Sequence, residues 1–243
     1  MINFKAASVF TLIIAFAAAA LIFFHKSHTS SSSTVVIPSK GEIGFLPLGD
    51  SYTIGQSVEA KDRWPNQLAA KFQSPGESFK IVANPAVTGY TSQDLINHEL
   101  DLVKKYRPSF VSVQIGVNDY VQGVPQETFK SNLDIIIQSV KKYITNPQNI
   151  ILVTIPDYGK TPTGAHYGDP SVSERAVRSF NTVIMQAGST YNIPVADIFP
   201  ASQAVLKDAS LIADDGLHPS AKQYKIWTDI IYETMISDAQ PKK

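Results

Sequence analysis

Short apolar runs alternate with longer segments of helical periodicity along most of this chain, and this alternation restricts the possible folds more than any other feature. Apolar runs that predict strands lie at 43–48, 79–83, 110–115, 150–155 and 193–198. Apolar residues recur every three or four positions at 63–72, 92–105, 128–144, 172–191 and from 219 onward, which predicts helices. Because alternating strands and helices favour a parallel sheet, we predict an α/β fold, a three-layer α/β/α sandwich around a five-stranded parallel sheet.

A doubly wound sheet of this kind gathers the carboxyl ends of its strands on one edge, where ligands bind. Ser51 follows the first predicted strand, Gly89 the second and Asn118 the third. Asp157 and Tyr158 follow the fourth. We therefore expect these five residues to lie on the same edge of the sheet.

The stretch 7–24 is apolar and uncharged. A helix of this length would extend about 27 Å, close to the hydrocarbon thickness of a bilayer. Residues 1–26 are thus expected to be a membrane anchor or a signal peptide, cleaved after 15–17 or 18–20. The serine-rich segment 27–40 reads as a flexible linker, and 41–238 as the folded domain. Both alternatives predict export: an anchored domain outside the cytoplasm, or a secreted or periplasmic one.

The charge balance and the absence of cysteine exclude several classes of function. Lys and Arg together number 21, as do Asp and Glu, so nothing indicates a nucleic-acid partner. The chain has no cysteine. Disulfides, thiolate catalysis and cysteine-ligated zinc are therefore excluded.

A serine nucleophile is indicated by Gly49-Asp50-Ser51, which follows the first apolar run. On a turn after a buried strand, Ser51 is expected to be exposed and rigidly held. Its base would be His218, because Asp215 precedes it by three residues and a single tight loop can hold the carboxylate against one imidazole nitrogen. Alternatively, Asp215 only caps the last helix, which we expect to begin at Pro219. The other histidines fit a linker, a helix surface or a loop: His25, His28, His98 and His166.

Acyl transfer also needs hydrogen-bond donors for the oxyanion that develops on the substrate. The backbone N–H of Ser51, the backbone N–H of Gly89 and the side-chain amide of Asn118 are available on the predicted edge. Taken singly, Gly89 reads equally well as a turn glycine and Asn118 as a turn former.

Four short blocks occur in order on the expected elements: Gly49-Asp50-Ser51, Gly89, Gly116-Val117-Asn118-Asp119 and Asp215-Gly216-Leu217-His218. In this arrangement the chain resembles the SGNH hydrolases, also called the GDSL esterase/lipase family, over about 200 residues. The resemblance implies a flavodoxin-like fold, with Ser51 as nucleophile, His218 as base and Asp215 as its partner. It also implies an oxyanion hole of Ser51, Gly89 and Asn118, with Asp50 and Asp119 bracing the loops. Tyr52 departs from the leucine of the family name.

The resemblance implies a serine esterase that needs no cofactor and no metal. Its substrate would be a small-molecule ester, an acyl lipid, a thioester or an acetylated saccharide. Two alternatives remain: acyl transfer to a saccharide or another alcohol by the same residues, and a non-catalytic domain that binds a cell-envelope partner. An α/β-hydrolase is disfavoured, because its Gly-x-Ser-x-Gly elbow would need glycine where Thr53 stands.

The segment 157–171, rich in Gly and Pro, is long for a connection in such a fold. Tyr158 and Tyr167 in it are candidates for the walls of a substrate pocket. Tyr52, Tyr90 and Tyr120 lie beside the other blocks. The alternative is that these tyrosines pack against neighbouring helices.

Overall fold

The structure is a computed structural model that describes residues 41–73 and 77–237. The predicted anchor or signal segment and the serine-rich linker lie outside the described residues. The strands are β1 (Gly41–Gly49), β2 (Glu77–Ile81), β3 (Phe110–Gln114), β4 (Ile150–Val153) and β5 (Val195–Ala196). The α-helices are α2 (Ser51–Ile54), α3 (Trp64–Lys71), α4 (Ser92–His98), α5 (Leu100–Tyr106), α6 (Val117–Val121), α7 (Gln126–Lys141), α8 (Pro170–Tyr191), α9 (Phe199–Ser202) and α10 (Ala221–Ser237). Six short 3₁₀ helices, η1 to η6, complete the described elements.

The five strands form one parallel sheet in the order β2-β1-β3-β4-β5. This is the flavodoxin-like order, so the predicted fold class is confirmed. After β1 the chain forms β2 next to one edge of β1 and then β3 next to the other edge. The strand order therefore reverses between β1 and β3, which makes this boundary the topological switch point. Ser51 directly follows β1 and Asn118 lies shortly after β3, so both flank the crevice where such sheets bind ligands.

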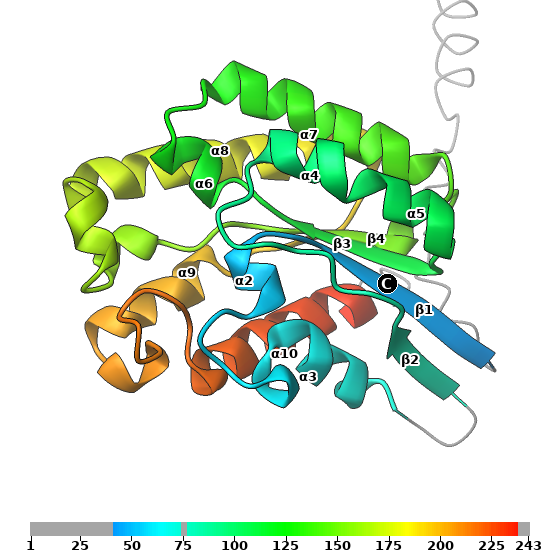
Figure 1. Cartoon of the computed structure of the whole chain (residues 1–243), viewed down its shortest axis with the longest axis horizontal. Coiled ribbons are helices and arrows are strands. Elements are labelled where there is room, and N and C mark those ends of the chain that lie inside the picture. The colour runs from blue at the N-terminus through cyan, green and yellow to red at the C-terminus, as the bar shows by residue number, and fades with distance from the viewer. Residues whose placement is uncertain (1–40, 74–76, 238–243) are drawn as a thin grey trace, which may run out of the picture. The chain divides into compact units, whose positions relative to one another are not determined.

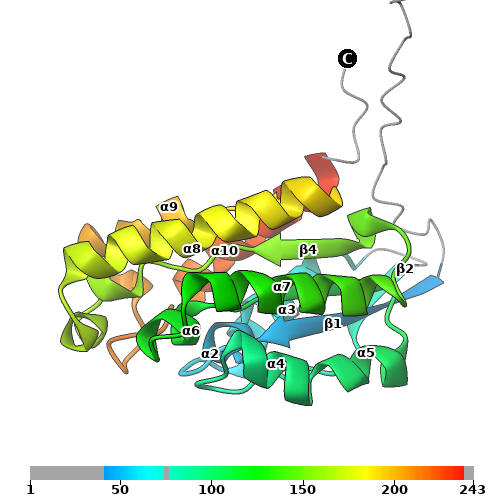
Figure 2. The same cartoon turned by 90° about the horizontal axis from the view of Figure 1, so that it is seen from above.

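Helices cover both faces of the sheet. Figure 1 shows α4, α5, α7 and α8 on one side and α3 and α10 on the other. Seen from above, α8, α7 and the α4–α5 pair lie side by side over the strands (Figure 2). The short helices α2 and α6 lie at the end of the sheet where the strands terminate (Figure 1).

The core lies between the sheet and these helical layers. Every residue of β3 and β4 is buried, which is why both strands read as nearly uninterrupted apolar runs. An aromatic cluster fills the space near β1 and β2, where the ring of Phe45 lies 5.1 Å from that of Phe79 and 5.6 Å from that of Phe110. Full burial of side chains of this size contributes about 1.5–3 kcal/mol each.

Several predicted boundaries differ from the observed ones. The helix predicted at 92–105 is two helices, α4 and α5, which meet at Glu99. The second strand begins and ends two residues earlier than predicted, and β5 is only two residues long. The sequence patterns did not predict α2, α6 or α9, because one turn of helix is too short to show apolar periodicity.

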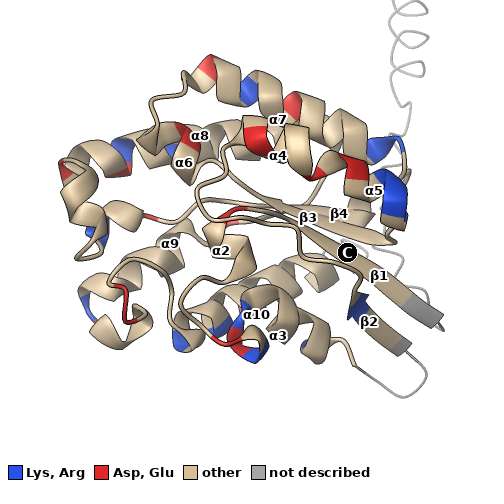
Figure 3. Ribbon diagram, viewed as in Figure 1, with Lys and Arg blue, Asp and Glu red and all other residues tan. Residues whose placement is uncertain are grey.

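Charged residues of both signs are interspersed over the two helical layers in the view of Figure 3. Among the helices of the described residues, none is both long and apolar enough to cross a bilayer. The apolar stretch 7–24 lies outside the described residues.

Candidate active site

The segment that carries Ser51 connects β1 to α2 in a conformation that requires glycine. A Cβ atom on Gly49 would lie 2.3 Å from both a carbonyl oxygen of β3 and Thr53 Oγ1, so no larger residue fits. Asp50 caps the helix, because its Oδ1 accepts the Tyr52 N–H at 3.0 Å. Ser51 is thereby the first residue of α2, held at the strand-to-helix junction.

His218 lies directly over Ser51. The distance from His218 Nε2 to Ser51 Oγ is 2.9 Å, although the two residues are 167 positions apart. The imidazole is itself packed against the Tyr52 ring, with centroids 5.1 Å apart. Ser51 is therefore only 4% exposed. The expectation of an exposed serine is wrong: Ser51 and the His218 side chain in contact with it are both buried.

Asp215 faces the other side of the same imidazole. Its Oδ2 lies 2.6 Å from His218 Nδ1 and also accepts the Ser57 hydroxyl at 2.6 Å. Its Oδ1 accepts the backbone N–H groups of Leu217 and His218, each at 2.9 Å. Partial burial acts to raise the pKa of Asp215, but these hydrogen bonds outweigh it and lower the pKa to about 2. Asp215 is thus ionised at neutral pH, and Ser57 is a contact that the sequence patterns did not reveal.

A tight loop presents Asp215 and His218 together. An antiparallel bridge joins Ile212 to Pro219, and the Ala213 N–H donates to the His218 carbonyl at 2.8 Å. Pro219 belongs to this bridge, so the last helix begins at Ala221 and not at Pro219 as predicted. The loop is therefore fixed by its own backbone hydrogen bonds before the helix starts.

Gly89 and Asn118 lie on the same edge of the sheet. Gly89 adopts a φ of +86°, and a Cβ atom placed there would meet nothing within 4 Å, so the space in front of it is open. The Asn118 amide donates to the Tyr90 carbonyl at 3.0 Å, and its nitrogen lies 3.4 Å from Asp50 Oδ2. One amide proton is well bonded and the second is held weakly, because 3.4 Å is long for such a bond. The backbone N–H groups of Ser51 and Gly89 have no partner among the described residues.

Residues 48–226 match the GDSL-like lipase/acylhydrolase family, which is most of the chain. The chain belongs to this family. It is therefore a hydrolase that acts on ester bonds. Curated relatives include the thioesterase 1/protease 1/lysophospholipase L1 of Escherichia coli K12, 27% identical over 72% of this chain and 74% of that protein. The arylesterase of Vibrio mimicus is 24% identical over 72% and 78%. The crystal structure of an Enterococcus faecalis lipase/acylhydrolase shares the fold, with a TM-score of 0.63 and 23% identity over 83% of this chain and 99% of that one.

In this GDSL hydrolase, Asp50 and Asp119 are buried and hold backbone. Asp119 accepts hydrogen bonds from both the backbone N–H and the hydroxyl of Ser92, the first residue of α4. Burial raises the pKa of Asp119. Burial also raises the pKa of Asp50 to about 7, with the charge of Asp119 adding to the effect. Both acids thus tie segments of the edge together.

The segment 157–171 of the GDSL hydrolase is a pair of 3₁₀ turns, η3 (Tyr158–Lys160) and η4 (Gly164–Tyr167). Tyr158 is buried, and its ring lies 6.3 Å from that of Tyr120 and 6.4 Å from that of Tyr167. Tyr167 is 56% exposed. Thr163 anchors the segment to the histidine loop, because its hydroxyl donates to the Asp215 carbonyl at 2.9 Å. Tyr158 thus packs within the protein, as the alternative to a pocket wall predicted, whereas the exposed Tyr167 can contact a ligand.

The other described histidines lie apart from Ser51. His98 is exposed with its ring 5.5 Å from that of Tyr90, and His166 is exposed on η4. Within residues 41–73 and 77–237, no cluster of three His, Asp or Glu residues could hold a metal ion.

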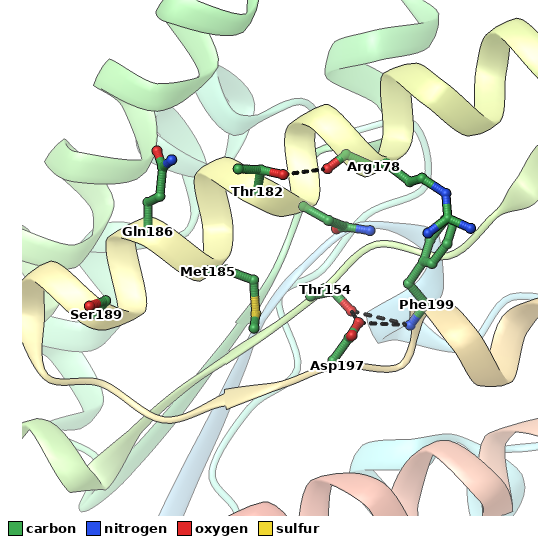
Figure 4. A pocket seen from close by; sticks show the side chains of 9 residues that line it. Thr154, Arg178, Thr182, Met185, Gln186, Ser189, Asp197 and Phe199 are labelled. Carbon is green, nitrogen blue, oxygen red and sulfur yellow. Dashed lines mark hydrogen bonds between the residues drawn. The ribbon is translucent and has the colours of Figure 1, made fainter.

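A surface pocket of about 530 Å³ lies along α8, beside the segment that follows β5 (Figure 4). Arg178 stacks on the Phe199 ring at 4.4 Å and pairs with Glu174, while Asp197 accepts the Thr154 hydroxyl at 2.9 Å. None of the predicted site residues lines this pocket. Its charged groups already have partners within the protein.

Proposed function

We propose that this GDSL hydrolase is an exported serine esterase that cleaves carboxylic esters through an acyl-enzyme on Ser51. The observation that carries the proposal is the position of His218 between Ser51 Oγ, at 2.9 Å, and Asp215 Oδ2, at 2.6 Å. Because Asp215 is ionised and accepts from Nδ1–H, the lone pair of Nε2 faces the Ser51 hydroxyl. This is the tautomer that a general base requires.

In the first step, Ser51 Oγ attacks the ester carbonyl carbon while its proton passes to His218 Nε2. The new C–O bond gives a tetrahedral intermediate with a negative oxygen. The imidazolium that forms is stabilised by the Asp215 carboxylate, which keeps its own charge.

The negative oxygen would be bound by the backbone N–H groups of Ser51 and Gly89 and by the second amide proton of Asn118. The free state of both backbone donors supports this role, as does the open space before Gly89. Asn118 keeps its bond to the Tyr90 carbonyl, which fixes the amide plane.

The intermediate collapses when the bond to the leaving alcohol breaks and His218 gives its Nε2 proton to that oxygen. Water then attacks the acyl-enzyme, again losing a proton to His218, and the acid is released as Ser51 regains its proton. All proton transfers use one imidazole, so the reaction is balanced without another acid or base.

Ester and thioester substrates are supported by the names of the relatives, a thioesterase/lysophospholipase and an arylesterase. Acyl lipids, thioesters and acetylated saccharides are the classes to compare, in a panel that varies acyl length and leaving group. Export is supported by the apolar stretch 7–24. Sequencing of the N-terminus from the cell's membrane and soluble fractions would separate an uncleaved anchor from a cleaved signal, and a cytoplasmic full-length protein would contradict export.

The nucleophile is tested with a short-chain nitrophenyl ester and a fluorophosphonate probe. Ser51→Ala should abolish both ester cleavage and labelling, because no other hydroxyl of residues 41–73 and 77–237 contacts His218 Nε2. Ser131→Ala, on the exposed face of α7, is the matched control and should behave as wild type. Peptide mass spectrometry should locate the phosphonate on Ser51. Labelling of a different serine, or full activity in Ser51→Ala, would refute the proposal.

A further inference from the structure

Glu99 is a buried acid that the proposed reaction does not use. It stands at the junction of α4 and α5 and is fully buried. Its Oε2 accepts the Gly49 N–H at 3.0 Å, across 50 positions of sequence, and its Oε1 has no partner among the described residues. Burying a carboxyl group costs free energy, so the position of Glu99 in the core calls for an explanation.

The pairing of β1 explains why an acceptor is needed there. β2 pairs with β1 only as far as Phe45, so β1 continues four residues beyond its neighbour. Phe45 O accepts from Val82 on the β2 side, so N–H groups two and four residues later face that same side. At Pro47 there is no N–H to satisfy. At Gly49 there is one, and Glu99 supplies the carbonyl oxygen that the missing strand would have provided.

The Gly49 peptide leads directly to Asp50 and Ser51. A rotation at Gly49 would therefore displace the cap of α2, the Ser51 N–H and the carboxyl that lies 3.4 Å from the Asn118 amide. A single hydrogen bond, from the Gly49 N–H to Glu99, thus helps to place two predicted oxyanion donors, the Ser51 N–H and the Asn118 amide.

The opposite end of α4 is held in a matching way. Ser92, its first residue, donates twice to Asp119, the neighbour of Asn118. The Gly89 turn immediately precedes the helix. α4 is about 10 Å long at 1.5 Å per residue. This one rigid helix therefore connects the Ser51, Gly89 and Asn118 segments.

We propose that Glu99 is a positioning residue of the Ser51 site, which holds the Gly49 peptide through one hydrogen bond and makes α4 a brace between the Ser51 and Asn118 segments. This inference rests on the proposed esterase function. It assigns Glu99 no contact with substrate.

The ionisation of Glu99 fits this role. Burial raises the pKa of Glu99 from 4.5 to about 9, and the neighbouring Asp50 adds to the effect. Asp119 in turn raises the pKa of Asp50, and Asp94 acts on Asp119. At neutral pH Glu99 is therefore a neutral acid that accepts through its carbonyl oxygen, and glutamine has the same shape and the same acceptor.

The test compares Glu99→Gln, Glu99→Leu and Glu99→Asp in the full-length protein, with Asp101→Asn as the control for an exposed acid two residues away. Glu99→Leu should lower kcat by about 10- to 100-fold with KM changed much less, because misplacement of a reacting group by about 1 Å has effects of this size. Glu99→Asp, whose carboxyl is withdrawn by one methylene, should fall between. Glu99→Gln should retain most of the activity, and Asp101→Asn all of it.

Amide hydrogen exchange gives a readout that does not depend on catalysis. Exchange at the Gly49 amide should accelerate in Glu99→Leu and Glu99→Asp but not in Glu99→Gln. If exchange accelerates while kcat in the folded fraction stays at the wild-type value, Glu99 is only structural and the proposal is overturned. If Ser51→Ala remains active, the esterase proposal fails, whereas the exchange result still decides whether Glu99 holds Gly49.

The pH dependence of melting provides a check if Glu99→Leu does not fold. Because the pKa of Glu99 is raised in the folded state, the wild-type protein loses stability as pH rises from the pKa of the unfolded state, 4.5, toward that of the folded state, about 9. Glu99→Gln removes this loss. The Tm of Glu99→Gln relative to wild type should therefore rise steadily between pH 5 and pH 9. A Tm difference that does not change with pH would overturn the proposal that a neutral Glu99 holds Gly49.

Discussion

Replacing Asp215 by Asn gives the sharpest test of the proposed base. The change keeps the acceptor for the loop N–H groups but moves the imidazole proton of His218 from Nδ1 to Nε2. The asparagine oxygen can still accept the Leu217 and His218 N–H groups that Oδ1 accepts now. The amide nitrogen then replaces Oδ2 and donates toward His218 Nδ1. The imidazole proton must move to Nε2, which can no longer accept from Ser51.

The expected loss follows from the charge that is removed. Two unit charges about 4 Å apart interact by about 4 kcal/mol at an effective dielectric constant of about 20. Loss of the attraction between imidazolium and carboxylate thus lowers the rate by about 10³-fold. The reversed tautomer adds to this, so we expect kcat to fall between about 10³- and 10⁴-fold.

The assay is nitrophenyl ester hydrolysis at pH 7–8, with thermal melting of both proteins and Asp215→Ala alongside. Asp215→Asn should melt somewhat below wild type, because the ionised acceptor of the Ser57 hydroxyl is lost. Asp215→Ala should melt lower, because it also leaves two loop N–H groups without acceptors. Activity of Asp215→Asn within tenfold of wild type would show that the carboxylate does not set the tautomer, and the reasoning would be refuted.

Two further predictions concern the oxyanion and the aromatic segment. Asn118→Ala should lower kcat by about 10²- to 10³-fold with a smaller change in KM, measured by steady-state kinetics; an unchanged kcat in protein that melts lower would make Asn118 structural. Tyr158→Ala should lower the free energy of unfolding by about 3–5 kcal/mol and reduce activity on all esters alike, since the ring is buried. Tyr167→Ala should leave melting nearly unchanged and shift the preferred acyl length or leaving group across an ester panel; an unchanged preference would remove Tyr167 from the substrate site.

The order of elements could be predicted because the sheet is buried on both faces and its strands are uniformly apolar. The break between α4 and α5 could not. Ile96, Leu100 and Val103 continue a helical spacing through position 99, and glutamate is a good helix former. The break coincides with the hydrogen bond from the Gly49 N–H on β1 to Glu99, a tertiary contact with no trace in the local pattern.

The candidate site shows the same division. Ser51, Asp215 and His218 stand out because their residue types and spacing suit one reaction. Ser57 did not, although it lies 2.6 Å from Asp215, because nothing in sequence links a serine in a left-handed turn to a carboxylate 158 positions away. The burial of Ser51 was also hidden, since its contact with His218 joins residues 167 positions apart.

The acids of this sheet edge differ in protonation because they differ in the hydrogen bonds they receive. Asp215 accepts from two side chains and two backbone N–H groups, which outweigh its partial burial and keep it ionised. Glu99 is fully buried and accepts from a single backbone N–H, so its neutral form prevails. Asp50 lies between them, with a pKa near 7. In the proposed reaction, a charge is thus retained beside His218, the proposed base, whereas a neutral acid holds the backbone that carries Ser51, the proposed nucleophile.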